Sequence, residues 1–200
     1  MKTHLATFFF FIWSFSLMAQ VEIPIEQYGQ NNNMYTISNS YFKDINGLLN
    51  KYIGTWEYNE NGHYFKVQFI KQENYQEVPL NSPSKTKWTS DRIYARFQYK
   101  LNGVEIYNTL NLAIPSQSLI YSTAGSFSIQ GFKLFYDEPS VSPCGRPLMG
   151  RVTLEHSVVN GVEKLTWSRE DSYSGTFCQQ GQVEDNTPFQ IPANMILTKI

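Results

Sequence analysis

Apolar and polar residues alternate along much of this chain, and Asn-Gly pairs separate the alternating segments. Residues 93–101 and 104–112 flank Asn102-Gly103, and both carry their apolar side chains on one face. Asn and Gly readily adopt the positive φ angles of a type I′ turn, so the pair predicts a two-residue hairpin. The predicted cross-strand pairs are Leu101 with Val104, Tyr99 with Ile106, Phe97 with Asn108 and Ala95 with Leu110.

The same pattern occurs around Asn61-Gly62 and Asn160-Gly161. Three hairpins with consistent registers predict antiparallel β structure. Each cross-strand pair contributes only about 0.2 to 1 kcal/mol, so most of the stability should come from a shared apolar face. The predicted pairs are Tyr58 with Phe65, Trp56 with Val67, Gly54 with Phe69, Val158 with Glu163, His156 with Leu165 and Leu154 with Trp167.

Further strands are expected at residues 118–122, 127–136 and 195–200. The alternation changes phase at Gly131, which predicts a β-bulge or tight bend there. Residues 42–52 form the one plausible helix, because three apolar side chains recur at helical spacing. The predicted fold is all-β, an antiparallel up-and-down barrel or curved sandwich of about eight to ten strands with one short N-terminal helix.

Two segments lack a regular pattern, residues 72–88 and residues 170–193. Both are long for connections in a compact domain, and long loops often carry binding sites. We interpret them as solvated connections. Residues 20–41 are polar and predict an extended lead-in, with a further edge strand near residues 34–37.

The chain begins with a short positive segment and an apolar run from Leu5 to Met18, followed by Ala19 and Gln20. This is the pattern of a secretory signal peptide cleaved between Ala19 and Gln20. At roughly 15 residues the run is shorter than the roughly 20 that span a bilayer. The sequence therefore predicts a signal peptide (1–19), a lead-in (20–41) and one β domain (42–200), exported to the periplasm or the medium without an integral membrane segment.

The charge balance excludes the usual signature of a nucleic-acid or membrane-surface binder. The 200 residues include 16 basic and 17 acidic side chains, for a net charge of −1. The signal peptide contains one basic residue, Lys2, and no acidic residue, so cleavage makes the chain slightly more acidic. Positive charges are scattered, and the densest group is Lys85 and Lys87 beside Trp88. We expect no nucleic-acid partner. The oligomeric state is left open.

Two cysteines, Cys144 and Cys178, are present in the whole chain. In an exported protein an even number of cysteines usually forms disulfides. The register of the hairpin at Asn160-Gly161 places Cys178 opposite the residue next to Cys144, so we predict a disulfide. Closing a loop of about 35 residues contributes roughly 4 kcal/mol in the chain-entropy model. A zinc site with His63 and His156 is the alternative, but the spacing fits no usual ligand pattern, so we expect no metal and no cofactor.

Patterns typical of catalysis are weak. No Gly-x-Ser-x-Gly nucleophile motif occurs. His63 is expected to be exposed or half-buried and His156 to be a core histidine. A glycosidase needs two carboxylates facing each other across a cleft, whereas these lie beside turns or on polar strand faces. The carboxylates considered are Glu57, Glu105, Glu155 and Asp171. The sequence predicts that the protein is not an enzyme.

Residues 48–58 contain Gly54-Thr55-Trp56 after a predicted helical turn. This segment resembles the entrance to calycin barrels, the lipocalins and avidins. The resemblance implies that Trp56 closes one end of a barrel and that a late arginine, Arg169 or Arg151, covers it. The whole chain also resembles a group of secreted proteins of Gram-negative bacteria that share Asp91-Arg92-Ile93 and a closing strand like residues 191–199. That second resemblance implies a fold and a compartment but no activity.

Two hypotheses about function follow. In the first, the barrel is a lipocalin-like carrier of a small apolar or aromatic ligand, although the same aromatic side chains can equally form a packed core. The lining would consist of Trp56, Tyr58, Phe65, Phe97, Tyr99, Tyr121 and Trp167. In the second, the protein is a surface module that recognises glycan or protein through exposed tyrosines. Those would be Tyr94, Tyr107 and Tyr173.

Overall fold

The structure is a computed structural model that describes residues 20–30, 40–77, 88–112, 118–128, 131–139, 148–172, 178–179, 181–182 and 187–200. The predicted signal peptide, the edge strand expected near residues 34–37, Lys85, Lys87 and Cys144 lie outside these residues. No helix in the described part is long and apolar enough to cross a membrane.

Twelve strands form one sheet in the described part of the chain. They are β1 (Val21–Pro24), β2 (Ser40–Lys43), β3 (Gly54–Glu60), β4 (His63–Glu77), β5 (Trp88–Leu101), β6 (Val104–Asn108), β7 (Ile120–Tyr121), β8 (Phe127–Ser128), β9 (Gly131–Glu138), β10 (Leu148–Val159), β11 (Val162–Ser172) and β12 (Asn194–Lys199). Two short 3-10 turns, η1 (Ile25–Gln27) and η3 (Ala124–Ser126), lie between them.

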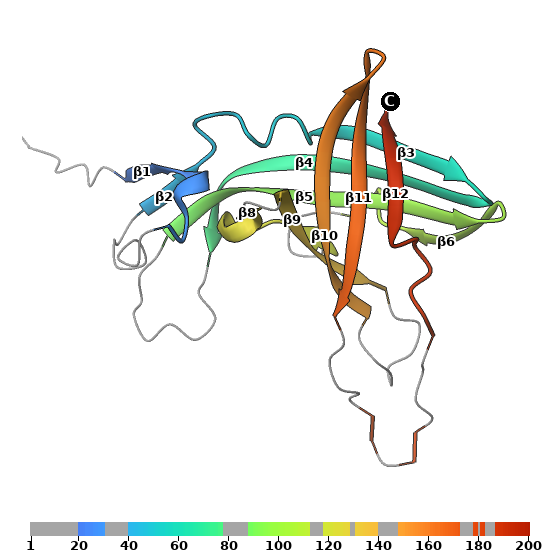
Figure 1. The fold of residues 1–200 in the computed structure, drawn as a ribbon. Helices are drawn as coiled ribbons and strands as arrows, with labels where there is room; N and C mark the ends of the chain where they lie inside the picture. The colour runs from blue at the N-terminus through green and yellow to red at the C-terminus, as the bar shows by residue number, and fades with distance from the viewer. Residues whose placement is uncertain are drawn as a thin grey trace, which may run out of the picture.

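Eight of the strands close into a barrel. The order β5-β4-β3-β12-β11-β10-β9-β7 returns to β5 through the β5–β7 pairing, and every pairing in this ring is antiparallel. Apart from β6 and β8, which lie beside the ring, neighbours in the barrel follow one another along the chain, and the pairing of β3 with β12, its first and last strands, closes it. The predicted all-β up-and-down barrel is confirmed. In Figure 1, β3, β4 and β5 run across the view and β10, β11 and β12 cross them steeply.

The long strands β4 and β5 extend beyond the barrel and carry the N-terminal strands. β2 pairs in parallel with β5 at Thr89 and Ser90, and β1 pairs in parallel with β2. The lead-in segment is therefore part of the same sheet, at the left of Figure 1. Trp88 packs here against Phe42, with ring centres 5.6 Å apart.

The Asn-Gly turns determine two of the hairpin registers as expected. Around Asn61-Gly62 and Asn160-Gly161, all six predicted pairs are formed. The φ angles of Asn61, Asn102 and Asn160 are 54°, 51° and 52°, and the glycine after each of them also has a positive φ angle. These angles are what a type I′ turn requires.

The third predicted register is correct only next to the turn. Leu101 pairs with Val104, but a register shift then places Tyr99 opposite Tyr107 instead of Ile106. Ala95 pairs with Ile120 of β7 instead of Leu110. The bulge leaves Ile106 39% exposed and turns the Tyr107 ring toward Tyr99, with ring centres 6.2 Å apart. Contacts with the rest of the barrel thus override the simple alternation.

Gly131 marks a reversal of the chain and not a bulge in one strand. Phe127 in β8 pairs with Phe132 in β9, so the two strands form a tight hairpin in which both phenylalanines face the core. Gly131 has a φ of +113°, which only glycine adopts easily. Residues 72–77, expected to be irregular, continue β4 through a register shift between Gln72 and Tyr75.

The predicted helix at residues 42–52 does not form. After β2 the chain makes successive turns, in which the Asn50 amide donates to the Gly47 carbonyl and the Tyr52 amide to the Leu49 carbonyl. Gly47 has a φ of +64°, which is incompatible with a right-handed helix. The Asp44 carboxylate accepts the Leu48 amide at 2.6 Å and so fixes the first turn.

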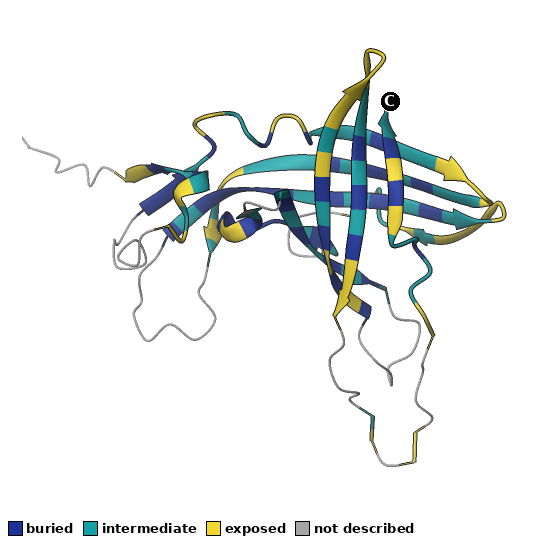
Figure 2. Ribbon diagram, in the orientation of Figure 1, coloured by how far each residue is buried: buried dark blue, intermediate teal, exposed yellow. Residues whose placement is uncertain are grey.

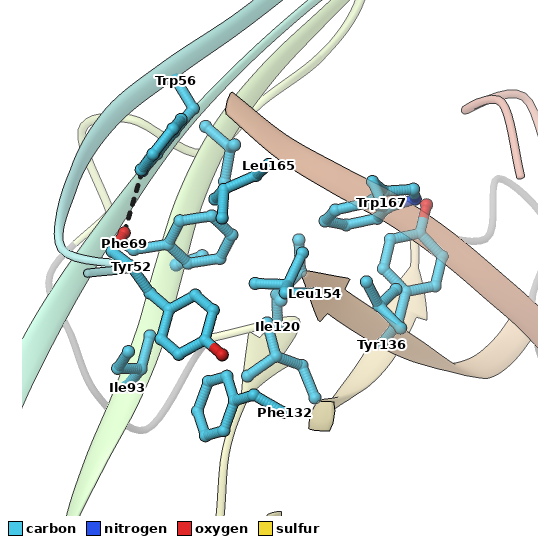
Figure 3. Packing of buried hydrophobic residues seen from close by; sticks show 14 of the residues in the cluster. Tyr52, Trp56, Phe69, Ile93, Ile120, Phe132, Tyr136, Leu154, Leu165 and Trp167 are labelled. Atoms are coloured by element: carbon cyan, nitrogen blue, oxygen red, sulfur yellow. Dashed lines mark hydrogen bonds between the residues drawn. The ribbon is translucent and has the colours of Figure 1, made fainter. Parts of the chain in front are cut away.

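The barrel interior is densely packed with aromatic and branched side chains. Buried and exposed positions alternate along the barrel strands (Figure 2). Leu154, Leu165, Phe132 and Tyr136 meet near the centre, with Trp56 and Trp167 on opposite sides of them (Figure 3). This continuous core supplies the apolar face that the hairpin pattern predicts.

Candidate functional site

Trp56 closes one end of the barrel. Its ring is fully buried and its Nε1 donates a hydrogen bond of 2.8 Å to the Tyr52 carbonyl (Figure 3). Lys199 lies over the ring, with Nζ 5.3 Å from its centre, and His156 approaches edge-on at 6.2 Å. The strand pairing explains this contact, because Lys199 is the register partner of Trp56.

The predicted arginine cover for Trp56 is therefore wrong, since Lys199 occupies that position. Arg151 stacks on Phe135 at 4.5 Å, and Arg169 lies over Phe189 at 3.9 Å, both away from Trp56. The alternation of apolar and polar residues does not show which cation covers Trp56, because it does not reveal that the last strand pairs with β3.

A small ionic group seals the outside of this closed end. Lys199 Nζ donates to both carboxylate oxygens of Glu163 at 2.9 Å, and His156 Nε2 lies 3.0 Å from the same carboxylate. Hydrogen bonding by Lys199, and secondly by His156, lowers the pKa of the Glu163 carboxyl. His156 was expected to be a satisfied core histidine; it has a partner in Glu163, but it is only half-buried and is not part of the core.

The opposite end, which we call the mouth, is built around a buried carboxylate. Glu138 ends β9 and is 4% exposed. Its Oε2 accepts a hydrogen bond of 2.6 Å from the Tyr136 hydroxyl, and its Oε1 accepts one of 3.3 Å from the Tyr107 hydroxyl. Tyr99 stacks on Tyr107, so three tyrosines surround the polar centre of the mouth.

Residues 187–193, which we call the strap, cross the mouth without forming a strand. Glu138 accepts two strap amides, Gln190 N at 2.5 Å and Ile191 N at 3.3 Å. The Tyr99 hydroxyl donates to the Gln190 carbonyl at 2.7 Å. Because His63 Nδ1 lies 2.7 Å from the same hydroxyl, His63 is the donor in that second contact. The strap is thus held mainly by side chains and not by a sheet ladder.

Arg169 joins the barrel wall to the strap. Its Nη1 donates to the Ile191 carbonyl at 2.6 Å and lies 3.9 Å from Glu138 Oε2, while its Nε donates to Asp171 at 2.6 Å. The guanidinium is also stacked over Phe189 of the strap. A buried ion pair contributes little net stability, because desolvation offsets the attraction, but losing one partner is costly. Arg169 and Glu138 therefore determine mainly where the strap lies.

The mouth tyrosines are held in the neutral form. Burial raises the pKa of Tyr99, Tyr107 and Tyr136, and the nearby Glu138 charge is the second cause. The pKa of Tyr136 is raised well above 10.0. Neutral hydroxyls are hydrogen-bond donors, which matches their contacts with the carboxylate and the strap. The mouth is thus a fully bonded polar network at neutral pH.

A hollow of about 280 Å³ opens to solvent beside the mouth. β3 and β12 pair only at Thr198 with Glu57 and Lys199 with Trp56, so the two strands separate toward the mouth and leave this space. The strap leads directly into the hollow, since Asn194 follows its last residue. The lining residues are Tyr58, Glu60, Thr166, Trp167, Ser168, Asn194, Met195 and Ile196.

The seven predicted lining residues are divided among three places. Five are fully buried in the core: Trp56, Phe65, Phe97, Tyr99 and Trp167. Tyr58 is half-buried and, with Trp167, lines the hollow. Tyr121 lies on the outer face of the barrel and stacks on Phe135 at 5.3 Å, so it does not face the interior. Their role in ligand binding stays a prediction.

The tyrosines expected on the surface also differ. Tyr107 is half-buried in the mouth, Tyr94 is half-buried on the outer face, and Tyr173 lies outside the described residues. The sequence analysis missed Glu138 and the strap contacts of Arg169. A signal was present, because Glu138 continues the inward series of Leu134 and Tyr136, and a carboxylate at an inward position requires partners.

A second buried polar cluster has a structural role. Asp91 accepts hydrogen bonds from the Tyr41 hydroxyl at 2.5 Å, from the Asp44 amide at 3.0 Å and from the Asn74 amide at 3.0 Å. Lys71 Nζ lies 3.1 Å from Asp44. Asp91 therefore ties β2 and the irregular part of β4 to β5, and it is occupied by these contacts.

The described residues contain no group of three His, Cys, Asp or Glu side chains placed to hold a metal ion. Of the predicted disulfide only Cys178 is described, so the bond to Cys144 stays a prediction. Glu57 accepts a hydrogen bond from the Tyr64 hydroxyl, and Asp171 pairs with Arg169.

A protein-family model described as a family of unknown function, DUF6705, matches residues 1–200. The barrel is consistent with the calycin resemblance, although the matching family is neither a lipocalin nor an avidin family. Neither the curated proteins nor the solved structures include a match to the chain.

Proposed function

Because the chain belongs to the family of unknown function DUF6705, we propose its function from the barrel itself. It is an exported, lipocalin-like binding protein that holds one small ligand with an apolar or aromatic face in the hollow beside the mouth, without catalysis. The observation that carries this proposal is the hollow of about 280 Å³ between β3 and β12, with Tyr58 and Trp167 in its lining.

The chemistry of the hollow supports a small ligand of mixed character. Typical small-molecule pockets have volumes of roughly 300 to 1,000 Å³, so this one is suited to a single ring system or a short chain. Tyr58 and Ile196 offer apolar surface, beside the buried Trp167. Thr166, Ser168 and Asn194 contribute polar groups that can orient a ligand.

The location follows from the packing. Trp56, Phe65 and Phe97 lie inside the barrel and are fully buried, so a ligand in the interior would have to displace core side chains. Such repacking typically costs 1 to about 3 kcal/mol or more. The hollow needs no such displacement, and we therefore place the ligand at the wall and not at the centre.

Export and the lack of catalysis rest on the sequence. The apolar run before Ala19 has the pattern of a signal peptide, and no nucleophile motif accompanies the histidines. The bonding of the mouth supports a binding role in one further respect. Glu138 and the neutral tyrosines already have hydrogen-bond partners, which suits a positioning network.

Native mass spectrometry of the exported protein tests the proposal. We expect the wild-type protein, recovered from the periplasm or medium, to carry an added small mass that is lost on denaturation. Ser168→Tyr should fill the hollow and abolish the added mass. Glu170→Tyr is the matched control, because Glu170 is exposed on the same strand and face but does not line the hollow.

The two variants separate the outcomes. Loss of the added mass in Ser168→Tyr and its retention in Glu170→Tyr supports the hollow as the site. An unchanged mass in both variants would reject the hollow, and a wild-type protein without any bound molecule would reject the carrier function. Circular dichroism of both variants checks that the barrel is intact.

A further inference from the structure

We propose that the outer face of the barrel carries a second binding site, for the anionic group of an organic acid, centred on Arg92. This site is independent of the proposed ligand in the hollow. We call it the outer strip and define it by Tyr75, Arg92, Tyr121, Phe135 and Arg151.

The strand registers bring the outer strip together. Tyr94 of β5 pairs with Tyr121 of β7, Tyr121 with Phe135 of β9, and Phe135 with Arg151 of β10. The residues that alternate with them, such as Ile93, Ile120 and Leu134, are buried in the core. The strip therefore lies on the outside of four neighbouring strands, and Tyr75 adds the adjacent strand β4.

Arg92 is a cation that is nearly buried and lacks a bonded partner. Its side chain is on the outer face, yet the residue is only 6% exposed. The guanidinium carbon lies 3.5 Å from the centre of the Tyr75 ring and 5.5 Å from that of Tyr121. Among the described residues it forms no hydrogen bond and no ion pair. A buried charge without such partners is costly, although stacking on aromatic rings offsets part of that cost.

Two buried polar atoms at this position have no hydrogen-bond partner. Arg92 Nε is sealed from solvent and has no hydrogen-bond partner, and the same is true of Gln72 Oε1. Gln72 is the register partner of Arg92 on β4. The terminal nitrogens of Arg92 also have no hydrogen-bond acceptor among the described residues. An incoming group can therefore meet the free edge of the guanidinium.

The nearest acidic side chains do not pair with Arg92. Glu77 accepts a hydrogen bond of 2.9 Å from the Ser90 hydroxyl. Burial raises the pKa of the Glu77 carboxyl, with the Ser90 bond and Arg92 opposing that shift. Asp137 lies on the outer face of β9, where burial also raises the pKa of its carboxyl.

The arrangement of the strip matches an organic anion. A guanidinium that stacks on a ring keeps its N–H edge free for two parallel bonds to a carboxylate, sulfate or phosphate. Tyr121 and Phe135 stack nearly parallel, at 12° and 5.3 Å, so their ring edges, and not their faces, are offered to the body of the ligand. Arg151, exposed and 4.5 Å over the Phe135 ring, adds a second positive charge.

Side-chain NMR of the wild-type mature protein tests the site without relying on a variant. Benzoate, acetate and sulfate are titrated while the arginine Nε–H resonances are followed. We expect a saturable shift at Arg92, with benzoate binding several-fold more tightly than acetate because its ring can pack against the aromatic ring edges of the strip. Arg96 is an internal control, since its Nε is also sealed and unpartnered, but its Nη1 donates to the Leu110 carbonyl.

Absence of a saturable Arg92 shift with all three anions, or equal shifts at Arg92 and Arg96, would overturn the proposal. Equal affinity for benzoate and acetate would reject the role of the aromatic surface and leave only the anionic group. Arg92→Lys keeps the charge but removes the planar fork, and should weaken benzoate binding at least tenfold, whereas Arg96→Lys should not. Ser168→Tyr should leave the Arg92 response unchanged, which separates this site from the hollow.

Discussion

The two ends of the barrel are closed by different kinds of chemistry. At the closed end the main contact is a buried indole ring, Trp56, and the charged groups of Lys199 and Glu163 stay near the surface. At the mouth a carboxylate and a guanidinium, Glu138 and Arg169, are themselves buried and hold an irregular segment. The closed end therefore gains stability from packing, whereas the mouth mainly determines the position of the strap.

The hydrogen bond of Trp56 and those that hold the strap also differ in sequence separation. Trp56 bonds to Tyr52, four residues away. Glu138 and Gln190 are 52 residues apart, and Tyr99 and Gln190 are 91 apart. The mouth thus requires the complete barrel before its network can form. This difference predicts that changes at the closed end alter global stability and that changes at the mouth alter local opening.

The largest effect is expected at the closed end. Trp56→Ala should lower the free energy of unfolding by about 3 to 5 kcal/mol, because it leaves a cavity in a sealed core. Chemical denaturation measures this loss. Trp56→Phe, which keeps a ring but loses the bond to the Tyr52 carbonyl, should lose less. A loss under about 1 kcal/mol in the alanine variant would mean that Trp56 does not seal the core.

We compare the predicted disulfide with the mouth, because Cys178 lies between β11 and the strap in the sequence. Non-reducing mass spectrometry should recover a peptide that links Cys144 and Cys178. Replacing both with serine should cost roughly 4 kcal/mol by the chain-entropy estimate. Hydrogen exchange should increase in the strap more than around Trp56. Two free thiols in the exported protein would rule out the bond.

A smaller, local effect is expected for Glu138→Gln. Replacing the carboxylate weakens its charge-assisted hydrogen bonds, at about 1.5 to 3 kcal/mol. Amide exchange should accelerate at Gln190 and Ile191, which donate to that carboxylate. Glu163→Gln at the closed end is the matched control and should leave strap exchange unchanged. Equal protection of the strap amides in both variants would show that Glu138 does not hold the strap.

The smallest effect at neutral pH concerns Tyr107→Phe, which removes one long hydrogen bond worth about 0.5 to 1.5 kcal/mol. The effect of this substitution on stability grows at alkaline pH. Folding raises the pKa of the Tyr107 hydroxyl above its ordinary value of 10.0, through burial and then the Glu138 charge, so the unfolded chain loses that proton first. Stability is therefore full below pH 10 and falls as the pH rises toward the folded pKa. Unfolding measured at increasing pH should show a shallower decline in the variant.

Tyr52 provides the comparison at the other end. Burial, followed by the Glu155 charge, raises the pKa of Tyr52 to about 12. Tyr52→Phe should therefore also flatten the alkaline decline. The expected difference lies in the strap, whose exchange should respond to pH in the wild type but less in Tyr107→Phe. If amide exchange in the strap depends on pH equally in the wild type and in Tyr107→Phe, the Tyr107 hydroxyl does not influence the strap.

Short-range features of the fold could be predicted from the sequence. The turns at Asn61-Gly62 and Asn160-Gly161 have the expected registers, because turn geometry and alternation act over adjacent residues. The register next to Asn102-Gly103 failed beyond its first pairs, since the contacts of Tyr107 with Tyr99 and Glu138 compete with local alternation. The helix near Tyr52 failed because Gly47 adopts a positive φ.

The candidate sites were less accessible to sequence reasoning. Trp167 and Tyr58 line the hollow, and their role in ligand binding stays a prediction, because only the separation of β12 from β3 creates the hollow beside them. Tyr121 was placed inside, whereas its pairing with Phe135 puts it on the outer strip. Periodicity assigns residues to two faces of a strand but does not say which face is inside when a strand is only two residues long.

The sequence by itself determined the all-β class, two hairpin registers and the importance of Trp56, because these depend on alternation and on turn residues close in the chain. Only the tertiary structure decided that Lys199 covers Trp56, that Glu138 holds the strap and that Arg92 is buried without a bonded partner. Those contacts join strands that meet when the barrel closes. The residues that make these contacts are far apart in the sequence, so the local alternation of apolar and polar residues does not predict them.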